Sequence, residues 1–361
     1  MTSSGLEGVV VADTAISDVD GERGVLVIAG EHVEDLAARG GFEAAMVRVL
    51  SAGAGGALPA GAAATTSQAR LAAWELLPRL GDALELPDGM DALKAALAHV
   101  RPSGVDGADA ITAIGAAAVF VAAWSRKRSG QPPVAPDASL DHATDYLRMT
   151  LGRTPAPAAA TALDAYLVTV IDHAMSASTF TARVIASTAS DLVSALVGGV
   201  GALKGPLHGG APGPVLDMLD AIGEPARAES WLLAELAAGR RIMGMGHRVY
   251  RVRDPRAAVL ETAVRPLASP RLTLARGVEA AAAKILRERK PDRALAANVE
   301  FYTAVLLDAV GLPREQFAPT FAVARVAGWS AHVLEQRRTG RLIRPSSTYV
   351  GAAPSRAALR E

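Results

Sequence analysis

The most informative stretch of this chain is Gly244-Met-Gly-His247-Arg-Val-Tyr-Arg-Val-Arg-Asp-Pro-Arg256. Glycines precede His247, and glycine permits the positive φ angles and the close backbone approach that larger residues exclude. A second histidine has a similar setting in Lys204-Gly-Pro-Leu-His208-Gly-Gly. Two histidines in glycine-rich turns, one of them followed by four arginines within nine residues, predict a site for an anionic substrate.

The sequence on either side of these two loops has the residue pattern of helices. Glycine and proline separate long alanine- and leucine-rich segments, and alternation with period two is scarce outside residues 9–12 and 25–28. Asp254 and Pro255 are typical of an N-cap and a first helical position, which puts Arg256 in the first turn of a helix. We therefore expect a mainly helical chain. The other expected helical segments are residues 163–174 with His173 at the edge of an apolar stripe, 181 to a stop at 198–199, one opened by Pro212 and Pro214, 231–238, 276–289, 293–310 and 320–338.

Composition narrows the class of protein. Half of the 361 residues are apolar, which is ample for large cores, and 37 basic residues balance 37 acidic ones. This balance provides no overall field for nucleic acid or for an anionic membrane surface, so neither is an expected partner. The chain has no cysteine, which excludes disulfides, thiolate nucleophiles and cysteine metal sites.

Nothing in the sequence predicts a membrane segment. The most apolar run, residues 111–123, is shorter than the ~20 residues that a membrane span needs, and it is more typical of a buried helix. The first residues lack a charged region followed by an apolar one, so we expect no signal peptide. We expect a cytoplasmic location.

Several blocks of sequence occur in an order that is typical of one family. They are Asp172-His-Ala-Met-Ser-Ala-Ser-Thr-Phe-Thr-Ala-Arg183, the two histidine loops, Asn298-Val-Glu-Phe-Tyr302, Ala327-Gly-Trp-Ser-Ala-His332 and Arg344-Pro345. With them the chain from about residue 172 to 351 resembles citrate synthases, particularly the shorter bacterial and archaeal form and its second-paralogue, 2-methylcitrate-type relatives. The first 160 residues match weakly, and Ile28-Ala29-Gly30 replaces a frequent Tyr-Arg-Gly.

The resemblance implies a two-domain, all-α fold and a homodimer. A large domain would comprise residues 1–209 and 319–361, and a smaller mobile domain, residues 210–318, would close over the substrates. The implied reaction condenses acetyl-CoA or propionyl-CoA with oxaloacetate and then hydrolyses the thioester, which yields citrate or 2-methylcitrate and free CoA. Neither a metal nor a redox cofactor is implied, because the CoA thioester is itself a substrate.

The resemblance also assigns roles to residues. His208 would donate a hydrogen bond to the thioester carbonyl, His247 would act on the ketone of oxaloacetate, and Glu300 would be the base. The residues implied to bind oxaloacetate are His173, His247, Arg256, Arg325 and Arg344, the last from the neighbouring subunit. Those implied to bind CoA are Arg241, Ile242, Gly244, Gly246 and Arg251.

The residues alone leave simpler readings open. His173 and His208 would be packing or turn histidines, Arg256 and Glu300 solvated surface charges, and Arg325 one half of a buried ion pair. Glu300 also departs from the family, in which most members have aspartate. The extra methylene leaves two alternatives, an adapted enzyme or a non-catalytic paralogue that retains the fold and ligand binding. One methylene in the substrate is worth only ~1–3 kcal/mol in an apolar pocket, so the sequence does not choose between acetyl-CoA and propionyl-CoA.

Overall fold

The computed structural model describes residues 5–6, 8–58, 65–209, 212–289 and 295–352, and helices make up most of this part of the chain. The all-α prediction is confirmed. The helices are α1 (Val33–Arg39), α2 (Phe42–Ala54), α3 (Thr66–Trp74), α4 (Gly89–Leu97), α5 (Asp106–Arg128), α6 (His142–Leu151), α7 (Pro157–Thr169), α8 (Ala177–Ala186), α9 (Leu192–Leu203), α10 (Pro212–Ile222), α11 (Ala228–Ala237), α12 (Pro255–Val264), α13 (Pro270–Arg289), α14 (Val299–Ala309) and α15 (Phe317–Thr339).

A small antiparallel sheet precedes the helices. Its strands are β1 (Ser17–Asp20), β2 (Val25–Ile28) and β3 (Glu31–His32), in that order. Ser17 lies opposite Ile28, and Val27 lies opposite His32. The apolar run at 25–28 is therefore a strand, whereas residues 9–12 are not.

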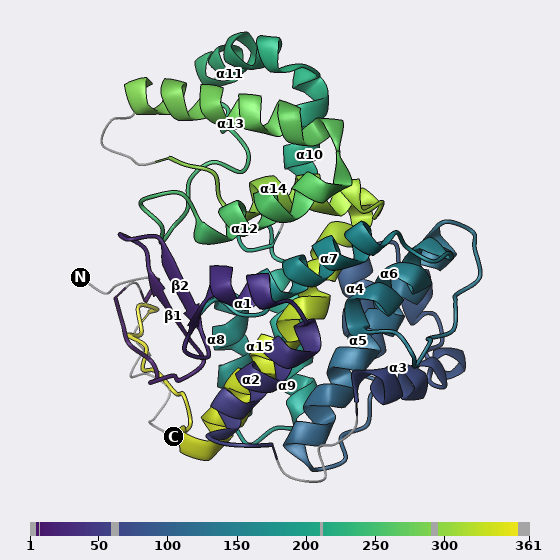
Figure 1. Cartoon of the computed structure of the whole chain (residues 1–361). Helices are drawn as coiled ribbons and strands as arrows, with labels where there is room; N and C mark the ends of the chain where they lie inside the picture. The colour runs from purple at the N-terminus through teal and green to yellow at the C-terminus, as the bar shows by residue number, and fades with distance from the viewer. Residues whose placement is uncertain (1–4, 7, 59–64, 210–211, 290–294, 353–361) are drawn as a thin grey trace.

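The core is built around α15, which runs through the main body and packs on α2, α5, α8 and α9 (Figure 1). Almost every side chain along it is buried, including Trp329 and His332 at 0% exposure. A helix that is buried around most of its circumference lies in the centre of a fold. The helices α10 to α14 gather at one end of the molecule, where α12 and α14 adjoin α7 (Figure 1).

Helix α5 is long and apolar enough to cross a membrane by length and composition alone, but 89% of its most apolar window is buried inside the fold. It packs against α3, α4, α6 and α15. The prediction of a buried helix at residues 111–123 is confirmed.

Two expected helices have other limits. Residues 181–199 were expected to form one helix, but the chain breaks after Ala186, and Asp191 caps α9 by accepting a hydrogen bond from the Ser194 N–H at 2.8 Å. Helix α9 then continues through Gly198 and Gly199. Glycine suits position 199, because a Cβ there would lie only 3.0 Å from the Trp329 ring. The missing side chain lets α9 approach α15.

The expected helix at 293–310 begins only at Val299, because the Asn298 side chain caps it by accepting a hydrogen bond from the Glu300 N–H at 3.0 Å. Residues 293–294 lie outside the described residues. The stripe at 163–174 is helical only to Thr169, so His173 follows the helix instead of lying on its edge. Helices α11, α13 and α15 each start three to six residues earlier than expected. The start of α12 at Pro255, with Asp254 as N-cap, is confirmed.

The crossing of α2 and α15 gives a stability prediction. A Cβ on Gly53 would lie 2.2 Å from the carbonyl oxygen of Ala331, so alanine cannot fit without moving the helices apart. Helix propensity alone would favour alanine by up to ~1 kcal/mol, but overpacking at a backbone contact outweighs this gain. We expect Gly53→Ala to lower the free energy of unfolding by about 2 kcal/mol, measured by urea denaturation.

Gly56→Ala is the matched control, because an added Cβ there has nothing within 4 Å. Equal stability of the Gly53→Ala protein and this control would contradict the tight crossing.

Candidate active site

His247 lies in the loop between α11 and α12. Its Nδ1 accepts hydrogen bonds from the backbone N–H groups of Val249 at 3.0 Å and Tyr250 at 3.1 Å. A neutral imidazole carries one proton, so an accepting Nδ1 places that proton on Nε2, which becomes a donor for a ligand. Burial, and next the nearby Arg256 cation, lower the pKa of His247 to about 4. At neutral pH His247 is therefore an uncharged donor.

His173 and Tyr250 complete an aromatic cluster with His247. The His173 and His247 ring centroids lie 5.6 Å apart, and those of His247 and Tyr250 lie 4.8 Å apart. Nε2 of His173 is 3.1 Å from the Tyr250 hydroxyl. Burial, followed by Arg256 and Arg325, lowers the pKa of His173 well below its usual value. Sequence reasoning missed Tyr250, although it lies inside the His247 motif.

Hydrogen bonds from the backbone and the side chain of Asn298 connect the start of α14 to the His247 loop. The Asn298 N–H donates to the Gly244 carbonyl at 2.9 Å, and Asn298 Nδ2 donates to the Gly246 carbonyl at 2.8 Å. Gly244 has a φ of 72°, and a Cβ on it would lie 2.9 Å from Phe301, so glycine is required here. This attachment brings Glu300, two residues after Asn298, to the same site as His247.

Arg256 is buried in the first turn of α12 with its carboxylate partner. Its Nη2 and Nε lie 2.8 and 3.0 Å from the two oxygens of Asp254. Asp254 also accepts hydrogen bonds from the N–H of Arg256 at 3.0 Å and of Val299 at 3.1 Å. The reading of Arg256 as a solvated surface charge is wrong, since its exposure is 3%.

Arg325 is a buried cation of a different kind. It is 1% exposed, its Nε donates to the Val170 carbonyl at 2.8 Å, and its Nη2 has no hydrogen-bond partner among the residues that the structure describes. In that part of the chain no carboxylate forms a salt bridge with it, so the expected structural ion pair is wrong within one chain. Burial lowers its pKa to about 10, against the opposing effect of Asp172, and Arg256 lowers it further.

Glu300 faces these cations from α14. Its Oε2 is buried and lacks a hydrogen-bond partner in the described chain. Burial raises its pKa to about 7, although Arg256 and Arg325 act in the opposite direction. A carboxyl group with this pKa exchanges protons readily near neutral pH, which suits a general base. The solvated-face reading of Glu300 is wrong.

His208 lies in the turn after α9, against the first residues of α8. Its Nε2 accepts a hydrogen bond from the Ser178 N–H at 3.2 Å and lies 2.8 Å from the Ser178 hydroxyl, which in turn accepts from Trp329 Nε1 at 3.1 Å. The ring proton of neutral His208 is thus on Nδ1. Burial, and then Arg325, lower its pKa to about 4. Ser178 belongs to the block at 172–183, but nothing in the pattern singled it out.

A cavity of about 670 Å³ adjoins His247. Of the residues expected to bind CoA, Arg241, Ile242 and Gly246 line it, whereas Gly244 and Arg251 do not. Arg251 instead turns toward the β1–β2 hairpin, where its N–H donates to the Gly21 carbonyl at 2.8 Å. Its guanidinium lies 3.9 Å from Glu22.

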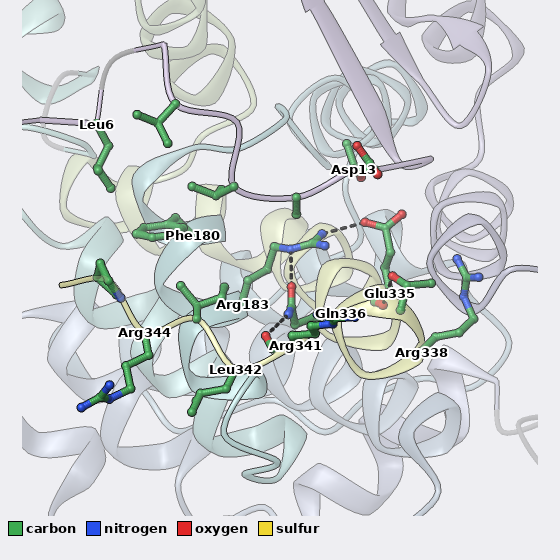
Figure 2. A pocket seen from close by; sticks show the side chains of 18 of the residues that line it. Leu6, Asp13, Phe180, Arg183, Glu335, Gln336, Arg338, Arg341, Leu342 and Arg344 are labelled. Atoms are coloured by element: carbon green, nitrogen blue, oxygen red, sulfur yellow. Dashed lines mark hydrogen bonds and ion pairs between the residues drawn. The ribbon is translucent and has the colours of Figure 1, made fainter. Parts of the chain in front are cut away.

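Arg344 is not brought to the histidines within one chain. It lies in an extended, exposed segment and lines a separate cavity of about 840 Å³ (Figure 2). Arg183 also lines this cavity, and its guanidinium donates hydrogen bonds to Glu335 at 2.7 Å and to Gln336 at 3.0 Å. Figure 2 shows the Arg344 guanidinium pointing away from this pair. Within the described ranges, no group of three or more histidine, aspartate or glutamate side chains is arranged to hold a metal ion.

The fold and the site together define an all-α enzyme with an internal site for a carboxylate substrate. A family profile described as citrate synthase, C-terminal domain, matches residues 5–346. The citrate synthase of Deinococcus radiodurans is 35% identical over 369 residues, covering 97% of this chain and 96% of that protein. The 2-methylcitrate synthase of Mycobacterium tuberculosis is 35% identical over 364 residues, covering 96% and 90%.

A solved structure agrees along the whole length. The ternary complex of carboxymethyl coenzyme A and oxaloacetate with citrate synthase from Thermoplasma acidophilum superposes with a TM-score of 0.86 at 27% identity, covering 98% of this chain and 97% of that one. This chain belongs to the citrate synthase family.

The histidine geometry gives a spectroscopic prediction. Because folded-state pKa values near 4 lie below the usual 6.5, both rings should remain neutral at pH 6. We expect ¹⁵N NMR to show the proton on Nδ1 in His208 and on Nε2 in His247, with signals assigned by their loss in the His→Gln variants. Two protonated nitrogens at pH 6, or reversed tautomers, would refute the arrangement.

Proposed function

We propose that the enzyme uses Glu300, His208 and His247 to condense an acyl-CoA with oxaloacetate. The observation that carries this proposal is that three groups occur in one site: a buried arginine, Arg325, without a carboxylate partner in the described chain, a carboxyl group whose pKa is about 7, and an uncharged donor histidine. An unpaired buried cation is unfavourable until an anion binds. A dicarboxylate such as oxaloacetate supplies the missing charge.

The first step is proton transfer. The Glu300 carboxylate takes a proton from the carbon next to the thioester carbonyl, and charge develops on the carbonyl oxygen. That proton is far less acidic than water, so a carboxylate cannot remove it without help. His208 supplies this help by donating its Nδ1 proton in a hydrogen bond to the oxygen.

In the second step the new carbon nucleophile attacks the ketone carbon of oxaloacetate. His247 Nε2–H donates a hydrogen bond to the ketone oxygen as it becomes an alkoxide. The alkoxide then takes up one proton, which balances the one that Glu300 removed in the first step. Water finally cleaves the thioester, and free CoA leaves. His173, placed beside His247, would contact oxaloacetate at the same site.

Guanidinium groups suit the grip on the two carboxylates, because each presents a planar fork of donors. Arg256 and Arg325 would provide two such forks. Arg344 would provide a third in the partner subunit's site, since it does not reach its own. We propose a homodimer for this reason.

The remaining assignments are also part of the proposal. Arg241, Ile242 and Gly246 would hold CoA in the adjoining cavity, with Gly244 and Arg251 supporting the loop. Residues 210–318 would close over residues 1–209 and 319–361, which excludes water until the carbon–carbon bond has formed. No metal or redox cofactor takes part, and the enzyme works in the cytoplasm.

The activity is tested by following free thiol release from acetyl-CoA and from propionyl-CoA, each with and without oxaloacetate, and by mass spectrometry of the product. Release that depends on oxaloacetate supports the proposal, and the ratio of the two rates identifies the acyl group. No release with either thioester, despite calorimetric binding of oxaloacetate, would favour a non-catalytic paralogue.

Glu300 separates the two alternatives. We expect Glu300→Gln to lower kcat at least 10²-fold, because the amide has nearly the same shape but no basic oxygen at neutral pH. Glu300→Asp should also lose activity if the site is adapted to glutamate, since a displacement near 1 Å costs on the order of 10²-fold. Higher turnover in Glu300→Asp would indicate a decayed site, and undiminished turnover in Glu300→Gln would remove Glu300 as the base.

The shared site predicts complementation. Arg344→Leu and His247→Ala homodimers should each be nearly inactive, because every site lacks one group. A heterodimer of the two should recover one competent site out of two, since one chain then contributes His247 and the other Arg344. Thiol release by purified, differently tagged heterodimers measures this recovery, and its absence would place Arg344 in its own chain's site or in none.

A further inference from the structure

Polar groups that the mechanism above does not use are buried beside Glu300. Nine buried side-chain nitrogen or oxygen atoms lack a hydrogen-bond partner in the described part of the chain. Five of them belong to α7, α14 and α15, and α7 contacts both of the other two helices. One of the five is Ser330 Oγ, and the four that concern the site are Tyr166 Oη, Glu300 Oε2, Thr303 Oγ1 and Arg325 Nη2.

The helices explain why these groups share one place. Glu300 and Thr303 are three residues apart on α14, so their side chains lie on the same face of that helix. Helix α7 packs on α14 and carries Tyr166, which is 0% exposed, as is Thr303. Burial raises the pKa of Tyr166, the charge of Glu300 is the next cause in the same direction, and the nearby Thr303 hydroxyl has a smaller, opposing effect. The Tyr166 phenol is therefore near both the carboxyl group and Thr303.

The hydroxyl groups of Tyr166 and Thr303 are chemically complementary to the Glu300 carboxylate. A buried hydroxyl that bonds to nothing is unfavourable, and an ionised carboxylate in a dry site needs donors for its oxygens. The hydroxyls of Tyr166 and Thr303 are such donors, whereas the Glu300 carboxylate can only accept. The longer side chain of glutamate, compared with aspartate, extends the carboxylate further from the α14 backbone.

We propose that Tyr166 and Thr303 are positioning residues, whose hydroxyls donate hydrogen bonds to the Glu300 carboxylate in the state that accepts the substrate proton. This inference rests on the proposed function of Glu300 as the base. The two hydroxyls orient the carboxylate and stabilise its ionised form. They bring no charge of their own to the site.

Most of the other charged and titratable groups around α14, the alternatives as hydrogen-bond donors to the Glu300 carboxylate, already have partners. Those facing Glu300 from the packed elements are Arg256 with Asp254 at α12, Arg325 on α15 and Tyr166 on α7. On the elements packed elsewhere on α14, Asp217 and Asp220 of α10 pair with Arg314, and Glu279 of α13 pairs with Arg253 and Tyr302.

The first test is the pH profile of kcat in Tyr166→Phe and Thr303→Val. With a donor removed, the ionised carboxylate is less stable, so the pKa on the acid limb should rise by about one unit from its value near 7. At pH 7 this shift alone lowers kcat about five-fold, and activity should recover toward pH 9. KM for oxaloacetate should change less than about two-fold, and Thr303→Ser, which keeps a hydroxyl, should restore the wild-type profile.

Tyr146→Phe is the matched control. Tyr146 is also fully buried, but its hydroxyl already bonds to Thr320 Oγ1 at 2.7 Å and to Gln316 Nε2 at 2.8 Å. Its removal should leave the pH profile unshifted, whatever it does to stability. Equal shifts in Tyr146→Phe and Tyr166→Phe would overturn the inference.

A second measurement separates this inference from the role of Glu300. Infrared titration of the Glu300 carboxyl band, assigned by its loss in Glu300→Gln, reports the pKa of that group without turnover. A raised carboxyl pKa in Tyr166→Phe supports the hydrogen bond even if kcat does not follow, in which case the base assignment fails instead. An unchanged carboxyl pKa in both Tyr166→Phe and Thr303→Val overturns the inference.

Discussion

Arg256 and Arg325 are two buried guanidinium groups, and in the part of the chain that the structure describes only Arg256 forms a salt bridge with a carboxylate. Burial lowers the pKa of Arg325, Asp172 opposes this shift, and Arg256 adds to it, because like charges in a low-dielectric interior repel one another. A bound anion would therefore stabilise the site. Burial first, and nearby arginines second, lower the pKa values of His173, His208 and His247, so each ring is uncharged at neutral pH.

Asp254 offsets the positive charge of Arg256 and connects two elements of the site. One carboxylate neutralises Arg256, caps α12 and accepts the Val299 N–H at the start of α14. The loop that carries His247 and the helix that carries Glu300 are thus joined through a single buried side chain. Asn298 reinforces the joint from the other side by binding the Gly244 and Gly246 carbonyls.

The sequence predicted those features that depend on neighbours along the chain. The cap at Asp254, the first-turn position of Arg256 and the loop positions of His208 and His247 all follow from residue types within a few positions. Features that depend on contacts between distant segments were missed. Gly198 and Gly199 were expected to end a helix, yet Trp329, about 130 residues later, makes a glycine there favourable. The roles of Ser178 and Tyr250 likewise depend on His208 and His173, and no local pattern indicates them.

Helix α15 packs on α2, α5, α8 and α9, and all four lie more than 100 residues before it in the chain. During synthesis the ribosome must therefore deliver almost the whole chain before the central helix is present, which takes roughly 20–70 s at the usual rates of about 5–20 residues per second. Until then α2, α5, α8 and α9 expose the apolar surfaces that α15 will cover. The packing of these four helices is therefore completed only after residues 317–339 have been synthesised.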